Sequence, residues 1–138
     1  MRDIKLRAWV KPIQIFANRQ YGYMIDVSVI NFEEKWVSDD EETVYEFHEI
    51  ELMQYTGMKD VKGVEIYEGD IVKASSRGIW GKFQVKWRQD GSPCWFMYPA
   101  WKSGVAWSLH GTLNDKGEYR DDVEVIGNIY ENPELLED

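Results

Sequence analysis

Residues 52–72 read Leu52-Met-Gln-Tyr-Thr-Gly-Met-Lys-Asp-Val-Lys-Gly-Val-Glu-Ile-Tyr-Glu-Gly-Asp-Ile-Val72. Two turn signals and two strand signals are combined here. Asp60 to Gly63 predicts a hairpin connection, because Asp opens turns through its side chain and Gly permits a positive φ. Glu68-Gly69-Asp70 predicts a second turn, which leads directly into the β-branched pair Ile71-Val72. The pattern indicates how the chain folds and carries no catalytic signature.

Alternation with a period of two extends on both sides of this segment. Residues 4–9 and 23–30 each read as one strand, and in the second we expect Ile25, Val27 and Val29 to face inward. Residues 13–16 would continue the first ribbon. Residues 44–52 combine some helical spacing with the alternation of a strand, and strand is the favoured interpretation. Further strands are expected at 53–56, 64–67, 70–75, 81–88, 94–98, 104–108 and 123–130.

The turn residues are assigned structural roles. Glycine suits backbone conformations that a Cβ would penalise, and an aspartate side chain can bond nearby amides in a turn. Asn132 and Pro133 suit the start of a short helical turn at the C-terminus. The structural turn positions are Gly57, Gly63, Gly69, Asp70 and Gly127.

Composition limits the class of protein. The chain has 138 residues, enough for one domain or a pair of small subdomains with an apolar core. Its hydrophobic fraction of 43% argues against intrinsic disorder. Cys94 is the single cysteine, which excludes an internal disulfide and a thiolate-rich metal site. With no signal-peptide pattern and no long apolar run, we expect a cytoplasmic protein that does not enter a membrane.

These patterns predict a mainly β protein. Short strands separated by glycine-bearing turns are typical of a sandwich or small barrel. We expect a small antiparallel SH3-like barrel over residues 53–138, an additional N-terminal β subdomain over residues 1–52, and a short C-terminal helical turn. The two parts are expected to form one compact unit overall.

Three segments of the chain together resemble the YopX-like proteins of bacteriophages and prophages. They are Arg2 to Trp9, the motifs between Met53 and Val72 described above, and Val125 to Leu135. Their order, spacing and terminal placement extend the resemblance over the whole chain. The resemblance implies a mostly β fold, a phage or prophage origin in a bacterial host cell, and a family without an established biochemical function. It defines no catalytic or ligand-binding residues to carry over.

Candidate catalytic and metal-binding residues are few. Glu68 and Asp70 would be the best carboxylate pair, since paired carboxylates can split their pKa values; a turn-forming Asp beside a solvated Glu is the favoured interpretation. A metal site would need both His48 and His110 with a carboxylate, and two separate rings are favoured. Cys94 lies in apolar company that would blunt its reactivity. We therefore expect no enzyme activity, no metal and no cofactor.

Charge gives two weaker signals. Residues 39–42, all acidic, could form a docking site, but an exposed connection is the simpler interpretation. A basic patch at Arg2, Lys5, Arg7 and Lys11 would instead be the charged outer face of a strand. The formal net charge of −9 disfavours nucleic acid without excluding it, because a local basic patch can dominate.

The seven tryptophans are the main functional prospect. Exposed rings could stack bases or anchor a protein partner, while core packing is the alternative for most of them. Trp87 is expected in the core, and Trp101 and Trp107 partly exposed. The possible interaction surface is Trp101, Trp107, Tyr98 and Trp80. We expect a non-enzymatic module that binds a protein or self-associates, with single-stranded nucleic acid as the alternative partner.

Overall fold

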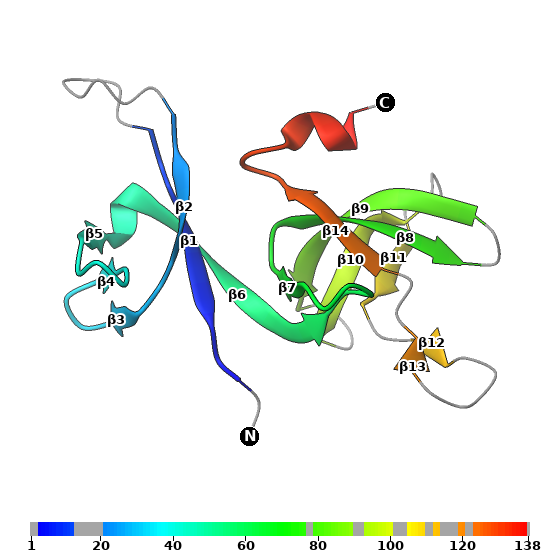
Figure 1. The fold of residues 1–138 in the computed structure, drawn as a ribbon, viewed down its shortest axis with the longest axis horizontal. Coiled ribbons are helices and arrows are strands. Elements are labelled where there is room, and N and C mark those ends of the chain that lie inside the picture. Colours follow the sequence, from blue (N-terminus) through cyan, green and yellow to red (C-terminus); the bar gives the residue numbers. More distant parts are fainter. Residues whose placement is uncertain are drawn as a thin grey trace. The chain divides into compact units, whose positions relative to one another are not determined.

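The computed structural model describes residues 3–12, 21–76, 79–89, 93–100, 105–109, 112–113, 119–120 and 123–137. It is mainly β, and its paired strands are antiparallel, as the sequence predicts (Figure 1). The expected strand at 13–16, as well as Trp101 and His110, lies outside the described residues.

The first strands and the first 3-10 helix are β1 (Leu6–Val10), β2 (Tyr23–Asp26), β3 (Val29–Asn31), β4 (Trp36–Ser38), β5 (Val44–Glu46), η1 (Phe47–Glu49) and β6 (Ile50–Lys59). The remaining elements are β7 (Glu65–Tyr67), β8 (Asp70–Ser76), β9 (Ile79–Arg88), β10 (Cys94–Ala100), β11 (Val105–Ser108), β12 (Thr112–Leu113), β13 (Tyr119–Arg120), β14 (Val123–Asn128) and the 3-10 helix η3 (Pro133–Leu136).

The chain divides into two compact units, Met1–Tyr55 and Thr56–Asp138. The division falls within β6, which pairs with β1 and is followed in its sheet by β7 (order β2-β1-β6-β7). Each unit has a hydrophobic cluster of its own. In the first unit the cluster is formed by Ala8, Val10, Val37, Tyr45 and Ile50.

The first unit departs from the predicted strands at residues 23–30. Two strands form here instead of one, because the backbone changes partner between Val27 and Ser28. Val27 N–H donates to Leu6 O (3.0 Å), whereas Ser28 N–H donates to Ser38 O (2.8 Å). The chain therefore leaves β1 and enters the three-stranded sheet β3-β4-β5. Val29, expected to face inward, is 50% exposed as a result.

Residues 44–52 also differ from the single predicted strand. A 3-10 turn, η1, separates β5 from β6. Its start is fixed by Glu46 N–H, which donates to Glu49 Oε1 (3.2 Å). A side chain that satisfies a backbone donor locally competes with strand pairing, and this explains the interruption.

Asp60 organises the hairpin between β6 and β7. Its Oδ1 accepts hydrogen bonds from the N–H groups of Lys62 and Val64 (2.9 Å each). Its Oδ2 accepts a third bond, from Val125 N–H in β14 (2.9 Å). Gly63 completes the turn with φ +82°, a conformation that L side chains rarely adopt. One carboxylate thus joins a local turn to a strand more than sixty residues away.

The turn before β8 is built by Gly69 and Asp70. Gly69 has a φ of 86°, and the buried Asp70 accepts a hydrogen bond from Tyr67 N–H at Oδ2 (2.8 Å). Gly57, inside β6, also has a positive φ. Gly127 lies against Asn132, where an added Cβ would come within 2.6 Å of the amide oxygen.

The second unit is built on a five-stranded antiparallel sheet in the order β11-β10-β9-β8-β14 (green to orange in Figure 1). Alternate residues of its strands face a common core, as the period of two predicts. Phe83 and Val85 of β9 are fully buried there. The rest of this cluster is Ile66, Val72, Ala74, Trp95, Met97, Leu109 and Val123.

Trp87 corrects one expectation about this core. It continues the inward register of Phe83 and Val85, yet it is 42% exposed. Its ring packs edge-on against Trp95, with the centroids 5.1 Å apart. Trp95 belongs to the buried cluster, and Trp87 packs against its ring while remaining partly exposed.

No helix in the described part of the chain is long and apolar enough to cross a membrane.

Candidate functional site

The structure places two of the four candidate aromatic residues on one face of the five-stranded sheet in the second unit. Trp80 in β9 is 57% exposed, and Tyr98 in β10 is 43% exposed. Trp107 belongs to β11, but its side chain is not described, and Trp101 lies outside the described residues. Both described candidates have the outward parity of their strands, opposite to that of the buried Phe83 and Met97.

Lysines share this outward parity. Lys82 and Lys86 alternate with the core residues of β9, and Lys73 lies opposite Lys82 on β8. Phe96 lies opposite Lys86 on β10. We call this surface the lysine–aromatic face; it comprises Lys73, Trp80, Lys82, Lys86, Phe96 and Tyr98. It is a basic patch on a protein whose net charge is strongly negative.

Two lysines of the face lie over its two exposed rings. The Nζ of Lys73 is 4.7 Å from the ring centroid of Trp80, and the Nζ of Lys86 is 4.7 Å from that of Tyr98. Both distances fall within the range of cation–π attraction, which contributes about 0.5–1 kcal/mol at exposed sites. Each ring therefore has a lysine Nζ within cation–π distance; Lys73 is exposed and Lys86 half-buried.

The register fixes the distance between the backbone positions that carry the two rings. Trp80 and Gln84 are four residues apart on β9, and Gln84 pairs directly with Tyr98. At about 3.3 Å per residue along a strand and about 4.8 Å between strands, the two rings are anchored roughly 14 Å apart. The backbone under both is a hydrogen-bonded ladder, so the spacing of these anchor points is preset before any ligand arrives.

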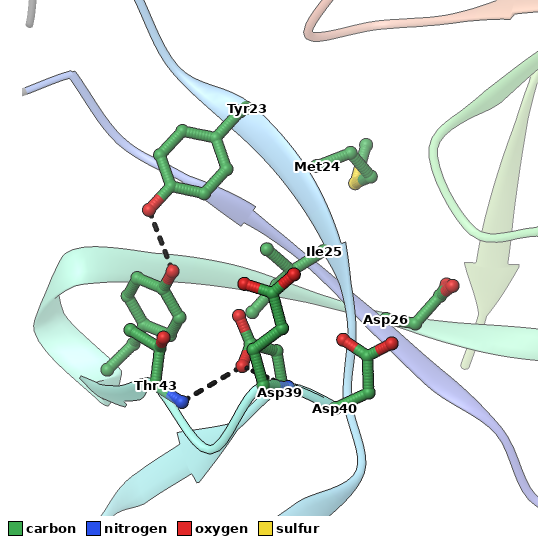
Figure 2. Close-up of a pocket in the computed structure, with 9 residues that line it drawn as sticks. Tyr23, Met24, Ile25, Asp26, Asp39, Asp40 and Thr43 are labelled. Atoms are coloured by element: carbon green, nitrogen blue, oxygen red, sulfur yellow. Dashed lines mark hydrogen bonds between the residues drawn. The ribbon is translucent and has the colours of Figure 1, made fainter.

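The first unit contains an open hollow of about 460 Å³ (Figure 2). Its carboxylates come from Asp26 at the end of β2 and from the β4–β5 connection, where Asp39, Asp40 and Glu41 lie. Tyr23, labelled in Figure 2, lines the hollow, and its hydroxyl oxygen lies 2.7 Å from that of Tyr45. The acidic run at residues 39–42 is thus a connection, as the sequence favours, and three of its residues line the hollow.

Part of the negative charge in the hollow is engaged by the loop itself. Asp39 Oδ1 accepts hydrogen bonds from Glu41 N–H (3.0 Å) and Thr43 N–H (2.9 Å). The remaining carboxylate oxygens suit a cation or a cationic side chain. These two hydrogen bonds lie within the loop and account for its shape without a ligand.

A second cluster was missed by sequence reasoning. Glu46, His48 and Glu49 bring one donor atom each to within 4.8 Å of one another around η1. His48 Nδ1 lies 3.4 Å from Glu46 Oε2. Imidazole and carboxylates are ligands for divalent transition metals, so these residues could in principle hold one. The signal was the Glu-Phe-His-Glu sequence, whose significance depends on a 3-10 turn that the pattern did not predict.

The remaining candidate reactive residues are Glu68, Asp70 and Cys94. Asp70 is buried and its carboxylate bonds to the turn, whereas Glu68 is only half-buried. Cys94 is half-buried at the start of β10.

Fold and face together define a class: an antiparallel β protein with an exposed basic and aromatic sheet surface. The family model described as YopX protein matches residues 5–137, and the chain belongs to this family. The resemblance seen in the sequence is thereby confirmed.

A solved structure supports the same fold. The crystal structure of protein EF1440 from Enterococcus faecalis is similar to this chain, with a TM-score of 0.51 and 24% sequence identity. The match covers 99% of this chain and 100% of that one. Among curated proteins, none matches.

Proposed function

We propose that this chain is a non-enzymatic binding module whose partner docks on the lysine–aromatic face. The observation that carries the proposal is the exposure of Trp80 and Tyr98 on one rigid sheet, each with a lysine over its ring. Large aromatic side chains are frequent anchors at binding surfaces, because they bury much area at low entropic cost. An open sheet face is also a shape that suits a large partner better than a small substrate.

Charge restricts what a protein partner must present. Lys73, Lys82 and Lys86 give the face its positive charge, and Glu124, opposite Lys73, pairs with Lys62, so a protein partner would dock an acidic segment there. This keeps the protein partner expected from the sequence and specifies its chemistry. Self-association would pair the face with an acidic surface of a second copy.

Single-stranded nucleic acid is the second candidate partner. The observation that favours it is the interleaving of lysines with exposed rings, since such surfaces combine phosphate contacts with base stacking. The net charge of −9 acts against it. At physiological salt, however, charges beyond about 8 Å are largely screened, and the local lysines dominate at the face.

A footprint of lysine acetylation tests the proposed docking face. The full chain is acetylated alone, with poly-L-glutamate, and with a single-stranded oligonucleotide, and modification is read by mass spectrometry. We expect at least one of the two polyanions to protect Lys73, Lys82 and Lys86, while Lys59 in β6 stays reactive as the control. Protection of none of the three by either polyanion would contradict the proposal.

The broader setting is also a proposal. Membership of the YopX family supports an accessory protein encoded by a phage or prophage and acting in the bacterial cytoplasm. The five-stranded sheet forms a half-barrel, which supports an SH3-like barrel for the second unit. Among the described residues β11 is an edge strand of that sheet, which supports self-association as an alternative use of the same unit.

A further inference from the structure

The lysine–aromatic face has the two recognition elements of a single-strand binder in register. Bases have flat π surfaces that stack on Trp and Tyr, and phosphates pair with lysine. Here the ring of Trp80 and the ring of Tyr98 alternate with Lys82 and Lys86 along β9 and its neighbour β10. We infer that this face binds single-stranded nucleic acid; the inference rests on the proposed docking face and names its ligand.

The spacing of the rings matches such a ligand. Their backbone anchor points, roughly 14 Å apart, span about four nucleotides of a strand that rises about 3.4 Å per nucleotide. This length is at the lower end of the roughly 4–16 nucleotides that small nucleic-acid-binding barrels cover. Trp80 and Tyr98 would thus hold the two ends of a short stacked segment.

The lysines over the rings would change partner when a strand binds. Lys73 and Lys86 each occupy the ring surface that a base would need. When a strand binds, each Nζ moves to a phosphate and a base takes its place on the ring. The cation loses one partner and gains a stronger one, because a phosphate carries a full charge.

The cross-strand pair Lys73 and Lys82 also supports the binding of a phosphate. Like charges directly opposite each other on neighbouring strands destabilise a sheet, and these two residues are partners in the β8–β9 ladder. Glu124 follows on β14 opposite Lys73, but its carboxylate pairs with Lys62 (2.8 Å). A phosphate placed between Lys73 and Lys82 would relieve their repulsion.

Other polyanions fit the face less well. A duplex neutralises lysines, but its bases are already stacked on one another and leave the rings uncovered. An acidic polypeptide also neutralises the lysines, but its carboxylates do not provide the flat π surfaces that stack on Trp and Tyr rings. The combination of rings and cations therefore selects an unpaired strand.

The test is a fluorescence-anisotropy titration of the full chain with a labelled 12-nucleotide oligo(dT). A duplex of the same length and poly-L-glutamate serve as competitors. We expect the single strand to bind more tightly than the duplex, and poly-L-glutamate to compete weakly. With three lysines releasing counterions, log K should fall against log[salt] with a slope of about −2.

Variants assign the binding to the face. Trp80→Ala and Tyr98→Ala should each weaken binding by about 5- to 140-fold, the loss expected for one stacked base. Trp80→Phe keeps a ring and should retain most of the affinity. Lys82→Gln should reduce the salt slope by about 0.7. Phe32→Ala and Lys59→Gln, an exposed ring and an exposed lysine elsewhere in the described chain, should change neither quantity.

The outcomes separate the inference from the proposed function. Binding of poly-L-glutamate without binding of the oligonucleotide overturns the inference and leaves the docking face standing. Failure of both polyanions to bind overturns both. Oligonucleotide binding that Trp80→Ala, Tyr98→Ala and Lys82→Gln leave unchanged places the strand elsewhere and also overturns the inference.

Discussion

Asp60 shows how one side chain can connect distant parts of the second unit. Burial of the carboxyl group opposes its charge and would raise its pKa. The backbone N–H groups of Val125, Val64 and Lys62 stabilise the anion more strongly, and the Lys62 charge adds to them. The pKa of Asp60 is therefore held below its ordinary value, and the carboxylate form is the one that stabilises the fold.

Replacing Asp60 should be costly. Asp60→Ala removes the acceptor of three backbone bonds and leaves partly buried N–H groups unsatisfied. We expect the free energy of unfolding to fall by roughly 2–4 kcal/mol, since bonds to a charged group contribute about 1.5–3 kcal/mol each and are not additive. Urea denaturation measures this. Asp60→Asn, which keeps one acceptor oxygen, should lose less; equal stability of Asp60→Ala and the parent would contradict this role.

The same residue predicts a dependence on pH. A carboxyl group whose pKa is lowered on folding stabilises the protein above its unfolded value of 3.8. That contribution is lost as the pH falls through the folded pKa. The stability difference between the parent chain and Asp60→Asn should therefore be largest near pH 7 and shrink below about pH 4. Urea titrations at both pH values check this, and a constant difference would argue against it.

Elements are predictable where their pattern is local. The hairpin at Asp60–Gly63 and the turn before β8 follow from side-chain hydrogen bonds over a few residues. The break between β2 and β3 does not, because it depends on which distant strand accepts the next N–H. A period of two fixes which residues share a face, but it does not identify the partner strand. The 3-10 turn η1 escaped prediction for a related reason, as Glu49 engages the backbone of Glu46.

Trp87 and Trp95 illustrate the same limit inside one ladder. Both have inward parity and are cross-strand partners, yet Trp95 is 8% exposed and Trp87 far more. Alternation gives the side of the sheet but not where along the strand the core ends.

The two tryptophans should differ sharply in their contribution to stability. Trp95→Ala should lower the free energy of unfolding by about 3–5 kcal/mol, the usual cost of deleting a large core ring. Trp87→Ala should cost about 1–2 kcal/mol, mainly through loss of the edge-on ring pair and partial burial. Chemical denaturation of both variants checks the order. Equal losses would mean that Trp87 belongs to the core after all.

The lysine–aromatic face, proposed as a docking surface, forms only when distant strands come together in the fold. The surplus of aromatic residues pointed to Trp80 and Tyr98 from the sequence alone. Their lysine partners were not weighed, because the net charge of −9 sums over all residues and hides a local basic patch. Lys73 comes from a different strand, so its position over Trp80 follows from the β8–β9 register. The hollow has a similar origin, as Asp26 and the 39–41 connection meet only in the fold.

The most direct test of the account is an amide NMR titration of the full chain with the 12-nucleotide strand. If the strand binds the lysine–aromatic face, chemical-shift changes should centre on residues 73, 80–86 and 96–98, together with the Trp80 indole N–H. Residues 39–43 at the acidic hollow should stay unchanged. Changes centred on that hollow, or none on β8–β10 at saturating strand, would contradict it.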